Sequence, residues 1–211
     1  MRGRIGASGL VPRAASALAD RASDSVRARG GDREVEVLLV CTGGGHLLEL
    51  WLLRAAWDGY ERAWVVGAEE RSEVAALLAG EQVHYAYSPA ARSVKNLLRN
   101  LALAVRLLRR LRPRVVLTTG AAVAVPFAWM ARLRRIPVAY IESLARAERP
   151  SLSCRLVAPI ADRVYVQWPE LRTVVPRARY AGTVLGGCWG RAAVGRSVRD
   201  SDAPAGREAL A

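Results

Sequence analysis

The feature that most constrains the fold is an alternation of short apolar segments with longer amphipathic ones, from about residue 35 to residue 185. Short runs rich in Val, Ile and Leu are typical of buried strands, and the segments between them are typical of helices. Because strands that alternate with helices form parallel sheets, the pattern predicts a Rossmann-like, doubly wound α/β domain. Strands are expected at 35–40, 63–66, 83–86, 115–117, 137–141, 164–166 and 178–181, and helices at 46–56, 72–78, 93–111, 122–133 and 154–161.

The two ends of the chain have a different composition. Residues 1–33 and 186–211 are rich in Arg, Ala, Ser and Gly and show no hydrophobic periodicity. Such a composition is typical of segments that do not form a hydrophobic core. We therefore expect one domain over residues 34–185, preceded by a disordered basic arm and followed by a flexible tail. No signal peptide and no uninterrupted apolar stretch of about 20 residues is visible, so any membrane contact is expected to be peripheral.

The chain carries a formal net charge of +13, and Lys95 is its only lysine. A basic surface favours anionic partners such as acidic lipid headgroups and diphosphates. Nucleic acid is not expected as a partner, because no nucleic-acid-binding motif accompanies the charge. Cys41, Cys154 and Cys188 are far apart and form no C-x-x-C pair, so neither a disulfide framework nor a metal site is expected.

A glycine-rich segment, Thr-Gly-Gly-Gly-His at 42–46, connects the first expected strand to the first expected helix. Glycines let the backbone turn tightly and approach a phosphate, and the helix that follows points its free N–H groups at the same place. His46 is placed to donate a hydrogen bond to a phosphate or sugar oxygen. Leu48 and Leu50 exclude the dinucleotide-binding pattern, and the absence of Gly-Lys-Ser/Thr excludes the P-loop. A simple strand-to-helix turn is the alternative.

Two further loops follow the fourth and fifth expected strands, and both are expected at the same edge of the sheet. Thr119 and Gly120 form the first, with a helix N-cap by Thr119 as the alternative. Glu142 and Arg146 lie in the second. A carboxylate there suits hydrogen bonding to sugar hydroxyls or service as a base, and an arginine suits a phosphate. A local ion pair between Glu142 and Arg146 is the alternative.

The segment 93–111 has the pattern of a basic amphipathic helix. Its apolar face is expected to pack on the sheet, which leaves the basic face free to contact anionic headgroups. The apolar face comprises Leu97, Leu98, Leu101, Ala104, Val105, Leu108 and Leu111, and the basic face comprises Lys95, Arg99, Arg106, Arg109 and Arg110.

A series of short motifs is spaced along residues 35–185. The motifs include Gly43-Gly44-Gly45-His46-Leu47, Ser88-Pro89 with Arg92-Ser93, Arg112-Pro113, Thr118-Thr119-Gly120, Val125-Pro126, Glu142-Ser143 with Arg146, Ala161-Asp162, Gln167-Trp168-Pro169-Glu170, and Tyr180 with Gly182. In kind and order they resemble the membrane-anchoring, acceptor-side subunit of the two-subunit N-acetylglucosaminyltransferase of dolichol-linked oligosaccharide synthesis, and its bacterial counterparts in exopolysaccharide and capsule synthesis. The chain is also similar to the N-terminal half of the transferase that adds GlcNAc to lipid-linked peptidoglycan precursor.

The resemblance implies the N-terminal, acceptor-side domain of a GT-B glycosyltransferase, with a separate small subunit supplying the C-terminal domain that binds the UDP-sugar. The implied acceptor is a sugar on a polyprenyl diphosphate, presented at the cytoplasmic face of the plasma membrane. His46 and Glu142 are the two candidates for the general base, and neither a metal nor a cofactor is implied. The residues implied to contact the acceptor or its diphosphate are Thr42, Gly43, Gly44, Gly45, Arg92, Thr119, Gly120, Ser143 and Arg146.

This sequence departs from the family in two ways. Eukaryotic members carry an N-terminal membrane helix, which residues 1–33 do not contain, so membrane contact is expected through the basic face of segment 93–111 or through the partner. The chain also ends where a donor-binding domain would begin, so activity is not expected without the partner. A non-catalytic scaffold that only docks the catalytic partner at the membrane is the alternative function.

Overall fold

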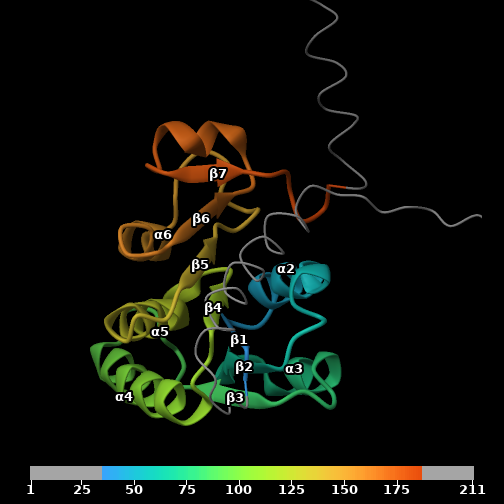
Figure 1. The fold of residues 1–211 in the computed structure, drawn as a ribbon, viewed down its shortest axis with the longest axis vertical. Coiled ribbons are helices and arrows are strands. Elements are labelled where there is room, and N and C mark those ends of the chain that lie inside the picture. Colours follow the sequence, from blue (N-terminus) through green and yellow to red (C-terminus); the bar gives the residue numbers. More distant parts are fainter. Residues whose placement is uncertain (1–34, 187–211) are drawn as a thin grey trace, which may run out of the picture.

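The computed structural model describes residues 35–186, apart from the side chains of residues 70–73, and it consists of a parallel sheet with helices on both faces (Figure 1). The expected arm, and the expected tail beyond Gly186, lie outside the described residues. Seven strands pair in the order β3-β2-β1-β4-β5-β6-β7, and each neighbouring pair is parallel. They are β1 (Val37–Cys41), β2 (Arg62–Gly67), β3 (Val83–Ala86), β4 (Val115–Thr118), β5 (Val138–Ile141), β6 (Arg163–Val166) and β7 (Ala178–Tyr180).

Helices connect the strands and divide between the two faces of the sheet. Figure 1 shows α2 and α3 on one face and α4, α5 and α6 on the other. This Rossmann-like arrangement confirms the predicted fold class. The α-helices are α2 (Gly45–Leu52), α3 (Arg71–Leu77), α4 (Val94–Leu111), α5 (Ala121–Leu133) and α6 (Leu152–Val157), and short 3₁₀ turns occur at η1 (Arg54–Ala56), η2 (Ala68–Glu70) and η3 (Pro169–Thr173).

The central strands are buried on both sides, which explains their unbroken apolar sequence. Every residue of β1, Val-Leu-Leu-Val-Cys, is buried, and so is every residue of β5. Side chains that alternate along these strands contribute to two separate cores: Leu38 and Val40 pack toward α4 and α5, whereas Leu39 and Cys41 pack toward α2. Burial raises the pKa of the Cys41 thiol well above its ordinary value, as expected of a cysteine that serves as a small apolar residue.

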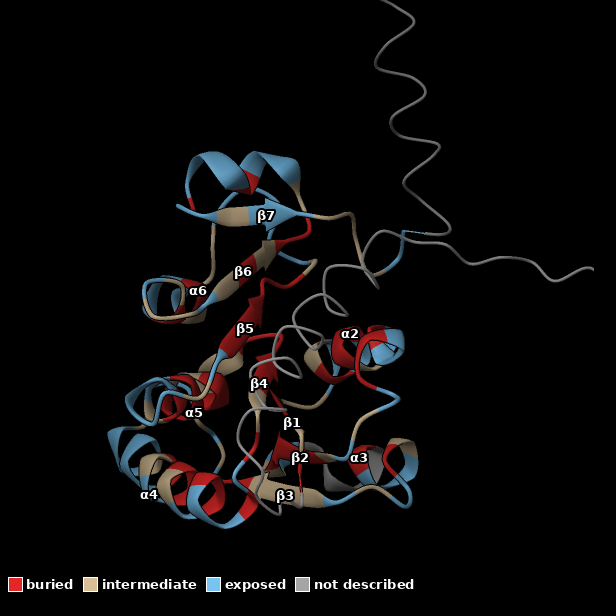
Figure 2. Ribbon diagram, viewed as in Figure 1, coloured by how far each residue is buried: buried red, intermediate tan, exposed pale blue. Residues whose placement is uncertain are grey.

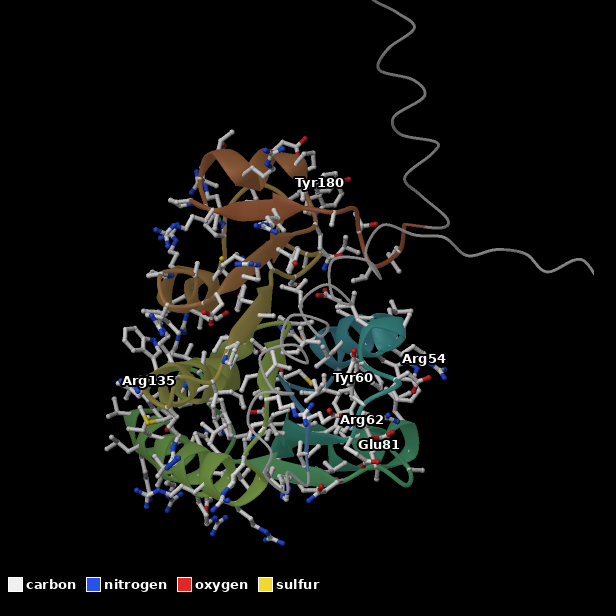
Figure 3. The ribbon with its side chains drawn as sticks, in the orientation of Figure 1. Arg54, Tyr60, Arg62, Glu81, Arg135 and Tyr180 are labelled. Atoms are coloured by element: carbon white, nitrogen blue, oxygen red, sulfur yellow. The ribbon has the colours of Figure 1, made fainter. Side chains whose placement is uncertain are left out.

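A group of three tryptophans closes the α2 side of the sheet. Trp57 packs edge-on against Trp64 at 5.3 Å between ring centroids. Arg62 lies 4.9 Å from the centroid of the Trp57 ring and makes a two-pronged ion pair with Glu81, at 2.6 Å and 2.9 Å. Figure 3 shows Arg62 and Glu81 side by side at this end of the molecule. The cluster holds the segment between α2 and β2 beside the amino end of β2, which is the opposite end of the strand from its carboxyl-end loop.

Helix α4 packs with a face that overlaps in part with the one predicted, because Ala104, Leu108 and Leu111 are buried as expected. Its buried residues are Asn100, Leu103, Ala104, Leu107, Leu108 and Leu111, whereas Leu97 and Leu98 are exposed. The exposure of Leu97 and Leu98 follows from the length of the helix. An 18-residue helix is about 27 Å long and a four-residue strand about 13 Å, so the first turns extend beyond the sheet. The predicted basic face is confirmed as exposed at all five positions, Lys95, Arg99, Arg106, Arg109 and Arg110, and the outer side of α4 is pale blue in Figure 2.

None of the helices among the described residues is both long and apolar enough to cross a membrane.

Candidate functional site at the carboxyl edge of the sheet

All strands are parallel, but the order in which the chain adds strands to the sheet reverses between β1 and β4. The chain passes outward from β1 to β3 and then returns, through α4, to place β4 on the other side of β1. In open α/β sheets, ligands bind beside the carboxyl ends of the strands at such a switch point. The glycine-rich loop follows β1 and the Thr119–Gly120 loop follows β4, so the structure brings these two predicted loops together there.

The backbone of His46 is held from the opposite loop. The hydroxyl of Thr119 donates to the carbonyl oxygen of His46 over 2.8 Å, and Thr119 itself is fully buried. Thr119 is therefore not the N-cap of α5; Gly120 occupies that position, and no side chain caps the helix. The imidazole of His46 is partly exposed, yet its Nδ1 atom is buried without a hydrogen-bond partner.

Glycine is required at two positions in these loops. Gly44, the N-cap of α2, has φ 63° and ψ −135°, and Gly120 has φ 103° and ψ −140°, conformations that residues with a Cβ rarely adopt. A Cβ on Gly120 would also lie 2.7 Å from the Tyr140 hydroxyl oxygen. Gly44 and Gly45 are exposed, and a Cβ on Gly45 would meet no atom within 4 Å. The loop thus presents bare backbone at the start of α2, as a phosphate site requires.

Glu142 is fully buried at the end of β5. One carboxylate oxygen accepts from the Ser143 amide at 2.9 Å and from the Tyr140 hydroxyl at 3.5 Å. The other accepts from the amide of Ser151 at 2.8 Å and from its hydroxyl at 3.0 Å. Both carboxylate oxygens of Glu142 therefore have hydrogen-bond partners other than Arg146, which is exposed. The alternative of a local ion pair between Glu142 and Arg146 is wrong. The arrangement ties the loop after β5 to the start of α6.

Glu49 was not singled out from the sequence, and it connects three segments at this edge. It lies on α2, one turn after His46, and is almost fully buried. Its Oε1 accepts from the Ser143 hydroxyl at 2.8 Å and from the Leu144 amide at 3.1 Å, and its Oε2 accepts from the Gln167 side chain at 3.3 Å. The available signal was a single acidic residue inside the apolar helix sequence Gly-His-Leu-Leu-Glu-Leu-Trp-Leu.

The loop after β6 completes this network. The Gln167 amide group also donates to the carbonyl oxygen of Glu142 at 3.1 Å, and its side-chain oxygen accepts from the Val184 amide at 2.9 Å. The indole of Trp168 donates to the carbonyl oxygen of Leu144 at 2.7 Å. The loops after β5 and β6 and the segment after β7 are therefore linked through buried polar side chains.

The electrostatics of the site centre on Glu49. Burial raises the pKa of its carboxyl group above the ordinary value of 4.5, while hydrogen bonds from Ser143 and Leu144 and the nearby His46 lower it, and Glu142 raises it further. Burial also raises the pKa of the Tyr140 hydroxyl, and the adjacent Glu142 adds to this shift. Two buried carboxylates thus lie close to each other beneath the loops.

The remaining predicted residues lie in loops at this edge and differ in how far they are buried. Thr42 and Gly43 are partly exposed beside Gly44, Ser143 is buried against Glu49, and Arg146 is exposed on the loop after β5. Arg92 is exposed in the loop after β3, with φ 58°, and two strands separate that loop from β4. The start of that loop lies near Thr42, because a Cβ on Gly67 would be 3.0 Å from the Ser88 hydroxyl oxygen and 3.5 Å from Thr42 Cγ2.

The fold is shared with solved structures. Over 64% of this chain it superimposes on MurG from Acinetobacter baumannii, with a TM-score of 0.54 and 19% identity, and it covers 42% of that chain. Over 76% it superimposes on UDP-N-acetylglucosamine 2-epimerase from Rickettsia bellii, with a TM-score of 0.58 and 14% identity, covering 48% of that chain. The chain thus spans less than half the length of these structures. The shared fold is the Rossmann-like fold found in one half of GT-B proteins.

Sequence relatives identify the family. Residues 37–184 match the family described as "Oligosaccharide biosynthesis protein Alg14 like", and the chain belongs to it. The protein called UDP-N-acetylglucosamine transferase subunit ALG14 in Eremothecium gossypii is 34% identical over 189 residues, which cover 74% of this chain and 82% of that protein. Its namesake in Candida albicans is 28% identical over 72% of this chain and 80% of its own length. In Yarrowia lipolytica the match is 38% identical and covers 41% of this chain and 43% of the relative.

Proposed function

We propose that the chain is the acceptor-binding, membrane-recruiting subunit of a heteromeric glycosyltransferase. The enzyme would transfer a sugar, GlcNAc, glucose or a related hexose, from a UDP-sugar to an acceptor linked to a polyprenyl diphosphate. Membership of a family whose relatives are named UDP-N-acetylglucosamine transferase subunits supports this proposal. The observation that carries it is the contact between Thr119 and His46 at the switch point, which joins the two predicted acceptor loops.

The chemistry of the two loops fits an acceptor diphosphate. Bare backbone at Gly44 and Gly45 precedes the N-terminus of α2, whose free N–H groups and positive dipole end attract phosphate oxygens. His46 lies in the first turn of the same helix and is partly exposed. Of the two candidate bases, this favours His46, because the Glu142 carboxylate is buried and already accepts hydrogen bonds from neighbouring groups. In this scheme His46 accepts the proton of the acceptor hydroxyl as the hydroxyl oxygen attacks the anomeric carbon of the donor sugar and the bond to UDP breaks, so that UDP leaves.

A second subunit would bind the UDP-sugar. A GT-B enzyme has its active site between two Rossmann-like domains, and this chain provides one of them. The partner is therefore a small protein with the donor-binding fold of a GT-B C-terminal domain, packed over the carboxyl edge of the sheet. Transfer by the isolated chain is not expected.

Anionic lipid headgroups fit the outer surface of α4. Residues 82–141 contain eleven basic residues and no acidic residue. Five of the basic residues, the predicted set on α4, are exposed on that helix, and Figure 3 shows nitrogen-bearing side chains projecting outward from it. Each such charge near an anionic surface contributes roughly 1 kcal/mol of attraction. This surface would hold the domain peripherally at the cytoplasmic face of the plasma membrane.

The decisive experiment is co-expression with a candidate donor-binding partner, followed by a transfer assay. The purified complex is expected to move sugar from a UDP-sugar to a prenyl-diphosphate-linked acceptor, and neither subunit alone is expected to do so. His46→Ala should leave the complex assembled and reduce transfer at least a hundredfold. Robust transfer by the isolated chain would disprove the split enzyme. Wild-type transfer by an assembled His46→Ala complex would instead favour a scaffold that docks the partner and contacts no substrate.

A further inference from the structure

We propose that Glu49 is a positioning residue, whose single carboxylate holds the helix bearing His46 and the loops after β5 and β6 in one fixed arrangement. This inference rests on the proposed function, because it assigns Glu49 a part in presenting the acceptor to His46.

The first step of the argument is topological. Strand β4 lies between β1 and β5, so α2 and the loop after β5 belong to elements that are not adjacent in the sheet. The Glu49 carboxylate nevertheless reaches Ser143 and Leu144, which are 94 and 95 residues away in sequence, and Gln167, which is 118 residues away. One side chain therefore links segments that the sheet alone leaves free to move relative to one another.

The second step concerns hydrogen-bond polarity. The three groups around Glu49 are a hydroxyl, a backbone amide and a side-chain amide, and each donates a hydrogen to the carboxylate. A carboxylate is acceptor-only and can satisfy all three. A glutamine at this position would have to turn its own NH₂ group toward one of these donors. The network therefore specifies the carboxylate and not merely a side chain of that size.

The third step connects Glu49 to His46. They are three residues apart on α2, so they lie on the same side of the helix. Their charges interact, since His46 lowers the pKa of Glu49. Thr119 holds the backbone of His46, while the buried Nδ1 atom of its ring has no hydrogen-bond partner. Glu49 therefore lies one helical turn from His46 and holds the loop after β5 against the same helix.

The test compares Glu49→Gln and Glu49→Asp with Glu170→Gln, which removes an equal charge from an exposed position on η3. In the complex with the donor-binding partner, Glu49→Gln is expected to lower kcat about tenfold to a hundredfold, with the KM for the UDP-sugar unchanged, because small misplacements of catalytic groups have effects of this size. Glu49→Asp keeps the charge and should restore part of kcat. Glu170→Gln should behave as wild type.

A second readout needs neither substrate nor partner. The chain contains two histidines, so His84→Gln assigns the imidazole resonances in an NMR spectrum. At constant pH the His46 ring signals and the Leu144 amide signal are expected to shift in Glu49→Gln and to stay in place in Glu170→Gln. Unchanged His46 signals, or a kcat within twofold of wild type per folded molecule, would overturn the positioning role. If the wild-type complex transfers no sugar, the proposed function fails. The NMR comparison still decides whether Glu49 determines the position and environment of the His46 ring.

Discussion

The hydroxyl of Thr119 donates to the carbonyl oxygen of His46 over 2.8 Å, although 73 residues separate the two in sequence. This bond directly links the loop after β4 to the first turn of α2, which follows the glycine-rich loop. Thr119→Val keeps the side-chain shape and removes the hydroxyl donor, while the carbonyl keeps its place in the helical hydrogen bonding of α2. We therefore expect the free energy of unfolding to fall by about 0.5–1.5 kcal/mol. Chemical denaturation measures this loss.

Thr173→Val is the matched control for that substitution. The Thr173 hydroxyl makes a bond of the same length, 2.8 Å, to the Glu170 carbonyl oxygen, but at an exposed position where water replaces it. Its effect should stay within about 0.5 kcal/mol. Equal losses in the two variants would mean that the Thr119 bond does not couple the two loops.

Gly45, the first residue of α2, and Gly120, the N-cap of α5, should respond differently to substitution by alanine. Gly120→Ala places a Cβ 2.7 Å from the Tyr140 hydroxyl oxygen and forces alanine to φ 103°, so a loss of roughly 1–3 kcal/mol is expected. Gly45→Ala meets no atom within 4 Å and should leave stability unchanged or raise it by about 0.5–1 kcal/mol. Thermal unfolding of both variants tests this contrast.

Gly45→Ala also separates stability from function. If the exposed backbone at the start of α2 receives a phosphate, the added methyl group lies in the path of the ligand. We therefore expect the variant to be fully folded and to bind a prenyl-diphosphate acceptor at least tenfold more weakly in a titration. Undiminished binding would show that the phosphate lies elsewhere.

Titration of Glu49 should be visible in the pH dependence of stability. Burial raises its pKa in the folded chain above the ordinary 4.5, so the folded state binds the proton more tightly than the unfolded state. The contribution of this group to stability is therefore fully present below pH 4.5 and is lost as pH rises through the folded-state pKa. We expect the unfolding free energy of wild type, relative to Glu49→Gln, to decrease over that interval. A difference that is constant with pH would contradict the shift.

The basic surface of α4 gives a prediction for lipid binding. Arg106→Gln with Arg110→Gln should weaken binding to anionic vesicles about tenfold or more at low salt, since each charge contributes roughly 1 kcal/mol. The pair Arg172→Gln with Arg179→Gln removes the same charge from exposed positions on η3 and β7. Flotation with and without anionic lipid distinguishes them, and equal losses in the two pairs would indicate a response to net charge alone.

The order of strands and helices was predictable because each element has its own hydrophobic period. The unbroken apolar run of β1 identified a buried strand, and the glycines after it identified the loop at its carboxyl end. The face with which α4 packs was predictable only in part from the periodicity, which identified Ala104, Leu108 and Leu111 correctly. Leu97 and Leu98 fit the apolar stripe of the helix, yet both are exposed. Their exposure depends on where the sheet ends, and a helical wheel carries no information about the length of the sheet.

The site was predictable in its loops and not in its internal connections. Thr119, Gly120 and Glu142 were found because each follows a strand. Such a residue either faces solvent or is buried with its polar atoms hydrogen-bonded inside the protein. Which of the two occurs depends on contacts with other segments, such as the hydrogen bond between Glu142 and Ser151. Glu49 was missed for the same reason, since its three partners come from loops about 100 residues away.

The lack of acidic residues between positions 82 and 141 has a consequence beyond lipid affinity. That stretch builds α4 and α5 on one side of the sheet, whereas exposed acids such as Asp58 and Glu61 lie in the connection from α2 on the other side to β2. The domain is therefore an electric dipole with its positive pole on the α4 side. Near a negatively charged surface, within about one Debye length of 8–10 Å, such a dipole experiences a torque. The domain would be oriented before it made contact, with α4 leading.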